Sequence, residues 1–229
     1  MSFFGLFGSK KPTLKLIPKT MVELEFENSE SEYENYFIEV VNVAKKKVTL
    51  NAPGTDMRPI RLVPGQPVTV STFDEDKNTF FSYSASVLDS REREFDVNPP
   101  KDVDSEEIPP RDENFRVEVP IQVEFRAMST VHSQVATTHA ITTNGLFLLT
   151  NLPIPPGTPL TLELEIPNAP DIKANGHAVN SERDGGGRKH ITEVEYDDIP
   201  EDDKRSILRY AIYYEQRQKR KQKRESEGL

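Results

Sequence analysis

Two arginines stand where the chain could bind an anionic ligand. The segment PPRDENFRVEV, residues 109–119, carries Arg111 and Arg116 at the start of an alternating strand pattern, with Asp112 and Glu113 between them. A guanidinium group is planar, and its fork of donors pairs with phosphate oxygens or with guanine O6 and N7. The arginines therefore indicate a site for an anionic ligand, and the neighbouring carboxylates oppose it.

A second polar group lies in the stretch AITTNG, residues 140–145. The hydroxyl of Thr142 can satisfy a phosphate or cap a turn, and the side-chain amide of Asn144 can both donate and accept hydrogen bonds. Gly145 permits a positive φ or a close backbone approach. The dipeptide Asn-Gly is typical of a hairpin turn, so we expect these residues, together with Ala140, at a wet turn.

Residues typical of catalysis are scarce. The chain has no cysteine, which excludes disulfides, thiolate nucleophiles and zinc–thiolate sites. The triple glycine at 185–187 falls in a predicted hairpin, where a turn explains it. The four histidines fall in strand-like segments without the spacing of a metal site; they are His132, His139, His177 and His190. We predict a non-enzymatic protein with no catalytic residue, no metal site and no cofactor.

Composition favours a soluble, cytoplasmic globular protein. Hydrophobic residues make up 35% and charged residues 29% of the 229 residues. The net charge is −9, so the surface as a whole does not attract nucleic acid. The apolar run at residues 3–7 is too short for a signal peptide or a membrane span. We expect residues 1–11 to be a flexible terminus, with peripheral membrane contact as the alternative.

Alternating runs between turn-rich loops predict a small antiparallel β-barrel over residues 12–97. These runs cover residues 21–26, 36–43, 46–51, 59–63, 67–72 and 78–88. Residues 98–113 contain four prolines and an acidic excess, which is typical of an extended, solvated linker. This linker carries the arginine motif.

A second β-barrel is predicted over residues 114–198. Every odd position from Phe115 to Phe125 is apolar, so one face of this segment is buried. Pro120 removes a backbone donor from the run and is expected at an edge or a bulge. A hairpin is expected around the glycines at 185–187. The predicted fold is therefore mainly β, with two small antiparallel barrels and a C-terminal helix.

The closing segment, residues 199–229, predicts an amphipathic helix with a basic tail. Ile207, Leu208, Ala211 and Ile212 form an apolar stripe at helical spacing, which packs either on its own barrel or on a second copy. The tail is either a solvated helix end or a contact for an acidic protein, anionic lipid, a phosphate backbone or the acidic linker. Its basic residues are Arg217, Lys219, Arg220, Lys221, Lys223 and Arg224.

Over roughly residues 12–224, the chain resembles the PilZ family in its two-domain, YcgR-like form. The stretch RDENFRV at 111–117 is similar to the family's RRxxFRV frame, and AITTNG overlies its D/NxSxxG turn. The resemblance implies an N-terminal YcgR-like barrel, a PilZ barrel and a closing helix. It also implies cyclic di-GMP as the ligand, held by Arg111, Arg116, Thr142, Asn144 and Gly145.

The sequence departs from the family frame at two anchors. Asp112 stands where the first arginine belongs, and Ala140 stands at the acidic or amide position of the turn. Arg111 lies one residue upstream, and Thr142 replaces serine. A hydrogen bond to a charged group contributes ~1.5–3 kcal/mol, so losing two such anchors costs on the order of 3–6 kcal/mol, or ~10²–10⁴ in affinity.

Three functions follow from this. The first is a regulatory adaptor of cyclic di-GMP signalling that acts through protein contacts in flagellar, pilus or polysaccharide machinery and has a weak or absent dinucleotide site. The second is a working cyclic di-GMP receptor with a variant clamp. The third is a binder of anionic membrane or nucleic acid through the basic tail. The sequence leaves the partner, the pathway and the choice between monomer and dimer open.

Overall fold

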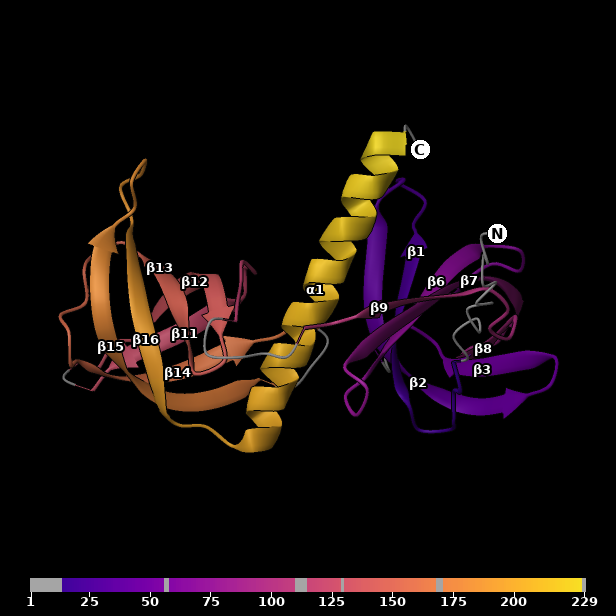
Figure 1. Ribbon diagram of the computed structural model, residues 1–229, viewed down its shortest axis with the longest axis horizontal. Coiled ribbons are helices and arrows are strands. Elements are labelled where there is room, and N and C mark those ends of the chain that lie inside the picture. The colour runs from indigo at the N-terminus through magenta and orange to yellow at the C-terminus, as the bar shows by residue number, and fades with distance from the viewer. Residues whose placement is uncertain (1–13, 56–57, 110–114, 129, 168–170, 228–229) are drawn as a thin grey trace, which may run out of the picture. The chain divides into compact units, whose positions relative to one another are not determined.

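The computed structural model describes residues 14–55, 58–109, 115–128, 130–167 and 171–227. The chain divides into two compact units between residues 110 and 111, and each is described here by itself. In both units the fold is built from antiparallel strands, which confirms the expected mainly β class (Figure 1). In these ranges, α1 (Glu201–Glu227) is the only helix, and no helix is long and apolar enough to cross a bilayer.

The first unit is a closed six-stranded barrel, drawn from indigo to magenta in Figure 1. The strands run in the order β6-β1-β2-β3-β8-β7, and β7 pairs with β6 to close the ring. Inward-facing residues such as Val22, Leu24 and Phe26 of β1 build its core. The strands are β1 (Met21–Glu27), β2 (Tyr33–Ala44), β3 (Lys47–Asn51), β6 (Pro67–Asp74), β7 (Thr79–Ser90) and β8 (Glu94–Val97).

The predicted linker differs from expectation, because part of it is a strand. Strand β9 (Val103–Glu107) pairs antiparallel with β7, and Ile108 after it is buried. The side chains of residues 104–107 remain exposed, as expected for an acidic, solvated segment. The backbone of the same residues is nevertheless hydrogen-bonded to β7. The run at 59–63 is not a strand beyond Pro59, which belongs to the short pair β4 (Gly54–Thr55) and β5 (Arg58–Pro59).

The second unit is also a closed six-stranded barrel. Its strands run β12-β11-β14-β15-β16-β13, with β13 paired to β12, and β10 pairs with the end of β12 on the same edge as β11. The predicted burial of alternate residues from Val117 to Phe125 is confirmed. The strands are β10 (Arg116–Val117), β11 (Gln122–Ala127), β12 (Gln134–Thr142), β13 (Gly145–Thr150), β14 (Pro159–Glu165), β15 (Ile172–Arg183) and β16 (His190–Asp198).

Helix α1 follows the second barrel and packs against β12. Acidic residues fill its first turn, where the helix dipole favours negative charge. The four residues of the predicted apolar stripe, Ile207, Leu208, Ala211 and Ile212, are all buried in the single chain. Burial of the stripe therefore does not require a second copy.

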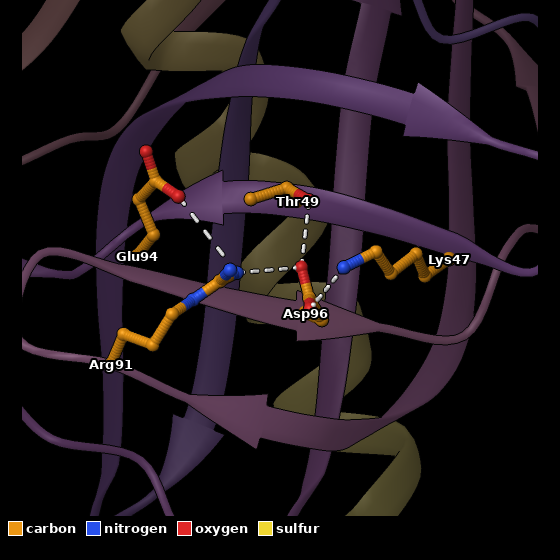
Figure 2. Close-up of polar contacts among 5 residues, drawn as sticks. All are labelled: Lys47, Thr49, Arg91, Glu94 and Asp96. Atoms are coloured by element: carbon orange, nitrogen blue, oxygen red, sulfur yellow. Dashed lines mark hydrogen bonds and ion pairs between the residues drawn. The ribbon is translucent and has the colours of Figure 1, made fainter.

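A buried carboxylate ties together the β3–β8 region of the first barrel (Figure 2). The side chain of Asp96 on β8 is only 4% exposed. Its Oδ2 accepts a hydrogen bond from Lys47 Nζ at 2.8 Å, and its Oδ1 accepts one from Thr49 Oγ1 at 2.7 Å. Arg91 Nη2 also donates to Oδ1, at 2.9 Å, and lies 3.8 Å from Glu94 Oε2. The carboxylate is thus satisfied from three positions along the chain.

These contacts set the protonation state of Asp96. Burial raises the pKa of its carboxyl, but hydrogen bonds from Lys47 and Thr49 and the charges of Arg91 and Lys47 outweigh burial, so the pKa lies below its ordinary value. A depressed carboxyl pKa stabilises the folded state fully above the ordinary value of about 4. The contribution is lost as pH falls through the lower, folded-state pKa.

We expect Asp96→Asn to lower the free energy of unfolding by ~1–3 kcal/mol near neutral pH, because an amide cannot accept the same charged hydrogen bonds. Urea unfolding followed by circular dichroism at neutral and acidic pH measures this. The gap between wild type and variant should narrow below about pH 4.

The matched control is Asp89→Asn. Asp89 lies opposite Asp96 in the β7–β8 ladder, but it is exposed. Its loss should stay within ~0.5 kcal/mol. Equal losses for the two variants, or a gap that widens toward acid, would contradict the role assigned to Asp96.

Candidate functional site

Arg116 is held on the outside of the second barrel. Strand β10 pairs with β12, so Arg116 stands opposite Thr142 in the ladder. Its Cζ atom lies 4.0 Å from the centre of the Phe147 ring on β13, which is cation–π distance. Two predicted site residues, Arg116 and Thr142, are thus brought together. Arg111 and Asp112 lie outside the described residues.

A buried threonine bridges the break that Pro120 makes between β10 and β11. Thr138 Oγ1 donates to Val119 O and accepts from Ile121 N at 2.7 Å, while Thr138 N donates to Ile121 O at 2.8 Å. Pro120 cannot donate to a ladder, and the expectation of an irregularity there is confirmed. Through these bonds β12 holds both short strands, and this positions Arg116.

The turn after β12 is closely packed through its glycine. A Cβ atom at Gly145 would lie 2.0 Å from Val194 O on β16, which is far inside contact distance. The carbonyl of Asn144 accepts a hydrogen bond from Tyr196 N at 2.9 Å. Lys204 Nζ of α1 donates to Asn144 Oδ1 at 3.4 Å. Asn144 therefore sits on the turn as predicted, with its amide oxygen facing a cation.

The expectation that Ala140 lies at a wet turn is wrong. Ala140 belongs to strand β12 and is fully buried, as is Ile141 beside it. The register of the β12–β13 ladder shifts between Thr138 and Ala140, so His139 is an extra residue and the alternation resets after it. A carboxylate at position 140 would be buried and desolvated in this structure, which costs free energy unless it is paired.

The polar turn opens onto a groove on the outer face of β13, β15 and β16. The groove has a volume of about 230 Å³. Its polar lining includes Thr142 and Asn144 together with two carboxylates, Glu193 and Glu195, that were not predicted from the sequence. We call it the β16 groove; it is lined by Thr142, Asn144, Gly145, Leu146, Phe147, Val179, Glu193, Val194 and Glu195.

The two glutamates reach the site through strand pairing. Glu195 stands opposite Gly145 and Glu193 opposite Phe147 in the β13–β16 ladder. They occupy alternate positions of one strand, so both point to the outer face. The alternation in HITEVEYDD marks them as outward-facing. Only the β13–β16 register, which sequence alone does not provide, places them beside the turn.

The basic tail divides into two kinds of residue. Arg217, Arg220 and Arg224 are half-buried, and the Arg217 guanidinium lies 5.3 Å from the ring centre of Tyr210. The three lysines are more exposed, and each lies 3.9–4.0 Å from a glutamate on the same helix; they are Lys219, Lys221 and Lys223. Surface ion pairs at this distance contribute little to the stability of the helix.

Among the described residues, no group of three histidine, aspartate or glutamate side chains is placed to bind a metal ion. His177 Nδ1 lies 2.6 Å from Asp197 Oδ1 across the β15–β16 pair. No third acidic or histidine side chain completes this pair as a metal site within the same described ranges. The pair is therefore an isolated hydrogen bond on the barrel surface.

Two protein-family models match the chain. The PilZ domain model matches residues 110–213, and the model for flagellar protein YcgR matches residues 18–97. No curated protein sequence matches significantly. Together the two models span most of both barrels and the first half of α1, as far as residue 213.

The solved structures that are remotely similar to this chain include the following three. The inhibitor of motility MotI/DgrA of Bacillus subtilis is 16% identical, with 88% of this chain and 99% of that chain covered and a TM-score of 0.42. The MrkH–c-di-GMP complex of K. pneumonia is 14% identical, with 89% and 90% covered and a TM-score of 0.42. YcgR in complex with c-di-GMP from Escherichia coli is 8% identical, with 90% and 88% covered and a TM-score of 0.38. At such values, family membership rests on the sequence models.

We expect Gly145→Ala to destabilise the second barrel by ~1–3 kcal/mol, because the added methyl group collides with the backbone carbonyl of Val194 and the backbone has to shift. Thermal unfolding measures the loss. Gly186→Ala is the control, since a Cβ atom there meets nothing within 4 Å. A Gly145→Ala variant as stable as the control would contradict the close approach of β13 to β16.

Proposed function

Because the chain belongs to the PilZ family, in its two-domain YcgR-like form, we propose that it is a non-enzymatic adaptor of cyclic di-GMP signalling whose own dinucleotide site is altered. The adaptor acts in the cytoplasm through contacts with protein partners. Flagellar, pilus and polysaccharide-export machinery are the partner classes implied by the family. Binding of cyclic di-GMP is weak or absent.

The observation that carries this proposal is the charge of the β16 groove. Cyclic di-GMP has two phosphates, each an anion. Glu193 and Glu195 line the groove beside Thr142 and Gly145, where the family's ligand would meet the turn. Like unit charges placed side by side at a protein surface repel each other, by about 4 kcal/mol at a separation of ~4 Å, so each carboxylate disfavours a neighbouring phosphate.

Two cations lie beside the groove, and each already has a contact that a ligand would have to compete with; Lys204 donates to Asn144 Oδ1. Arg116 lies on the Phe147 ring, so ligand binding has to compete with that contact or share it. Ala140 offers no polar group and is fully buried. The expected loss from missing anchors, on the order of 3–6 kcal/mol, and the carboxylate repulsion act in the same direction.

One observation favours the alternative, a working receptor with a variant clamp. Arg116 and Thr142 are direct neighbours in the β10–β12 ladder, so an arginine and a hydroxyl are already placed side by side. In this alternative, Arg111 takes the role of the missing first arginine. The experiment below separates the two hypotheses.

The exposed lysines of α1 form a second contact for a partner with acidic groups. Lys219, Lys221 and Lys223 are 47%, 65% and 74% exposed at their side chains. A protein with net charge −9 offers little general attraction for nucleic acid, so we propose a protein surface as the partner of this helix end. Anionic lipid is the competing occupant.

Calorimetric titration with cyclic di-GMP at physiological salt tests the altered site. We expect wild type to bind with a Kd weaker than ~100 µM. Asp112→Arg combined with Glu195→Gln restores a cation and removes one repulsive charge, so it should tighten binding ~10²-fold. Glu165→Gln on β14, an exposed carboxylate away from the β16 groove, is the charge-matched control and should change nothing.

Micromolar binding by wild type would overturn the altered-site proposal in favour of the variant clamp. Arg111→Ala should then abolish that binding. A folded double variant that still fails to bind would show that the loss lies in the shape of the barrel rather than in these charges.

A further inference from the structure

The β16 groove has the character of a docking face for a protein segment. Its walls carry apolar and acidic groups together: the Phe147 ring, Val179 at 40% exposure, and the carboxylates of Glu193 and Glu195. Aliphatic side-chain stems pack on such apolar surface while a charged head reaches a nearby carboxylate. This combination suits lysine and arginine side chains.

The β16 groove is small and open, so a segment lying across it places individual side chains in it. Pockets for small molecules and cofactors usually measure ~300–1,000 Å³. The β16 groove, at about 230 Å³, is below that range. An open groove of this volume accommodates parts of a peptide chain, with the rest of the segment lying across the strand surface.

The spacing of the two carboxylates specifies the pattern of the occupant. Glu193 and Glu195 are alternate residues of β16, so their Cα atoms are about 7 Å apart along the strand. Alternate side chains of any extended peptide have the same separation and share one face. Basic residues at every second position of an extended segment therefore meet both carboxylates in register.

The β10 side of the groove limits the direction of approach. The Arg116 guanidinium covers the Phe147 ring from that side and presents positive charge. A basic segment is repelled there and attracted on the side of Glu193 and Glu195. The face is thus polarised across its width, which orients the segment along β16.

We propose that the β16 groove binds an extended segment of a partner protein in which arginine or lysine alternates with small residues. This rests on the proposed adaptor function and names the chemistry of its partner. In this proposal, the region of the barrel where the family resemblance implies cyclic di-GMP binding binds a basic protein segment instead.

Fluorescence anisotropy with a short labelled peptide tests the proposal at physiological salt. The probe alternates arginine with threonine; the comparison peptide has the same composition with its arginines contiguous. We expect wild type to prefer the alternating peptide and Glu193→Gln/Glu195→Gln to weaken its binding about tenfold. Glu163→Gln/Glu165→Gln removes two carboxylates at the same spacing on β14 and should leave binding unchanged.

Thermal unfolding of each variant checks that it is folded. If the groove double variant is unfolded, Glu195→Gln alone replaces it, because Glu195 is exposed, and about threefold weaker binding is then expected. Equal losses in the β14 variant, or no preference for the alternating peptide, would overturn the proposal, since general electrostatic attraction would explain both.

Two further outcomes distinguish peptide docking in the β16 groove from the altered dinucleotide site on which it rests. Micromolar binding of cyclic di-GMP to wild type overturns the altered site, while peptide binding that persists would leave the docking face standing. Self-association in sedimentation experiments that disappears in the Glu193→Gln/Glu195→Gln variant would overturn the assignment to a partner protein, because a second copy would then be the occupant.

Discussion

The hydroxyl of Thr138 is the contact on which the outer face of the second barrel depends. A proline interrupts the first strand of that barrel, and a buried threonine on the neighbouring strand supplies the missing hydrogen bonds from both its backbone and its side chain. Without this bridge, β10 would have only its two ladder pairs to hold it. The position of Arg116, the cation of this face, therefore depends on it.

The electrostatics of that face follow from which strands are neighbours. β10 contributes a cation, β13 an aromatic ring and β16 two carboxylates, in that order across the surface. The cation is stabilised by the ring, and the carboxylates lie beyond it. A ligand with two phosphates meets favourable and unfavourable charge at once, whereas a basic chain finds one side of the face open to it.

Local alternation predicted the barrels well because it reports which side of a strand is buried. It did not find β9, whose exposed, acidic side chains look like linker although the backbone is paired. The turn motif misplaced Ala140, which lies inside β12 and is buried, beyond the extra residue at His139. Glu193 and Glu195 reach the turn only through the pairing of β13 with β16, which is non-local information. Register, more than strand identity, limited the site prediction.

The tight approach of β13 to β16 at Gly145 bears on how such proteins diverge. The glycine is required by the carbonyl behind it, whatever ligand lies in front. A lineage that abandons dinucleotide binding is therefore free to exchange Asp, Arg or Ser side chains around the turn, but it has to retain this residue to keep the barrel closed. A glycine at this position therefore reflects the close packing of β13 against β16. It does not indicate whether the protein binds a dinucleotide.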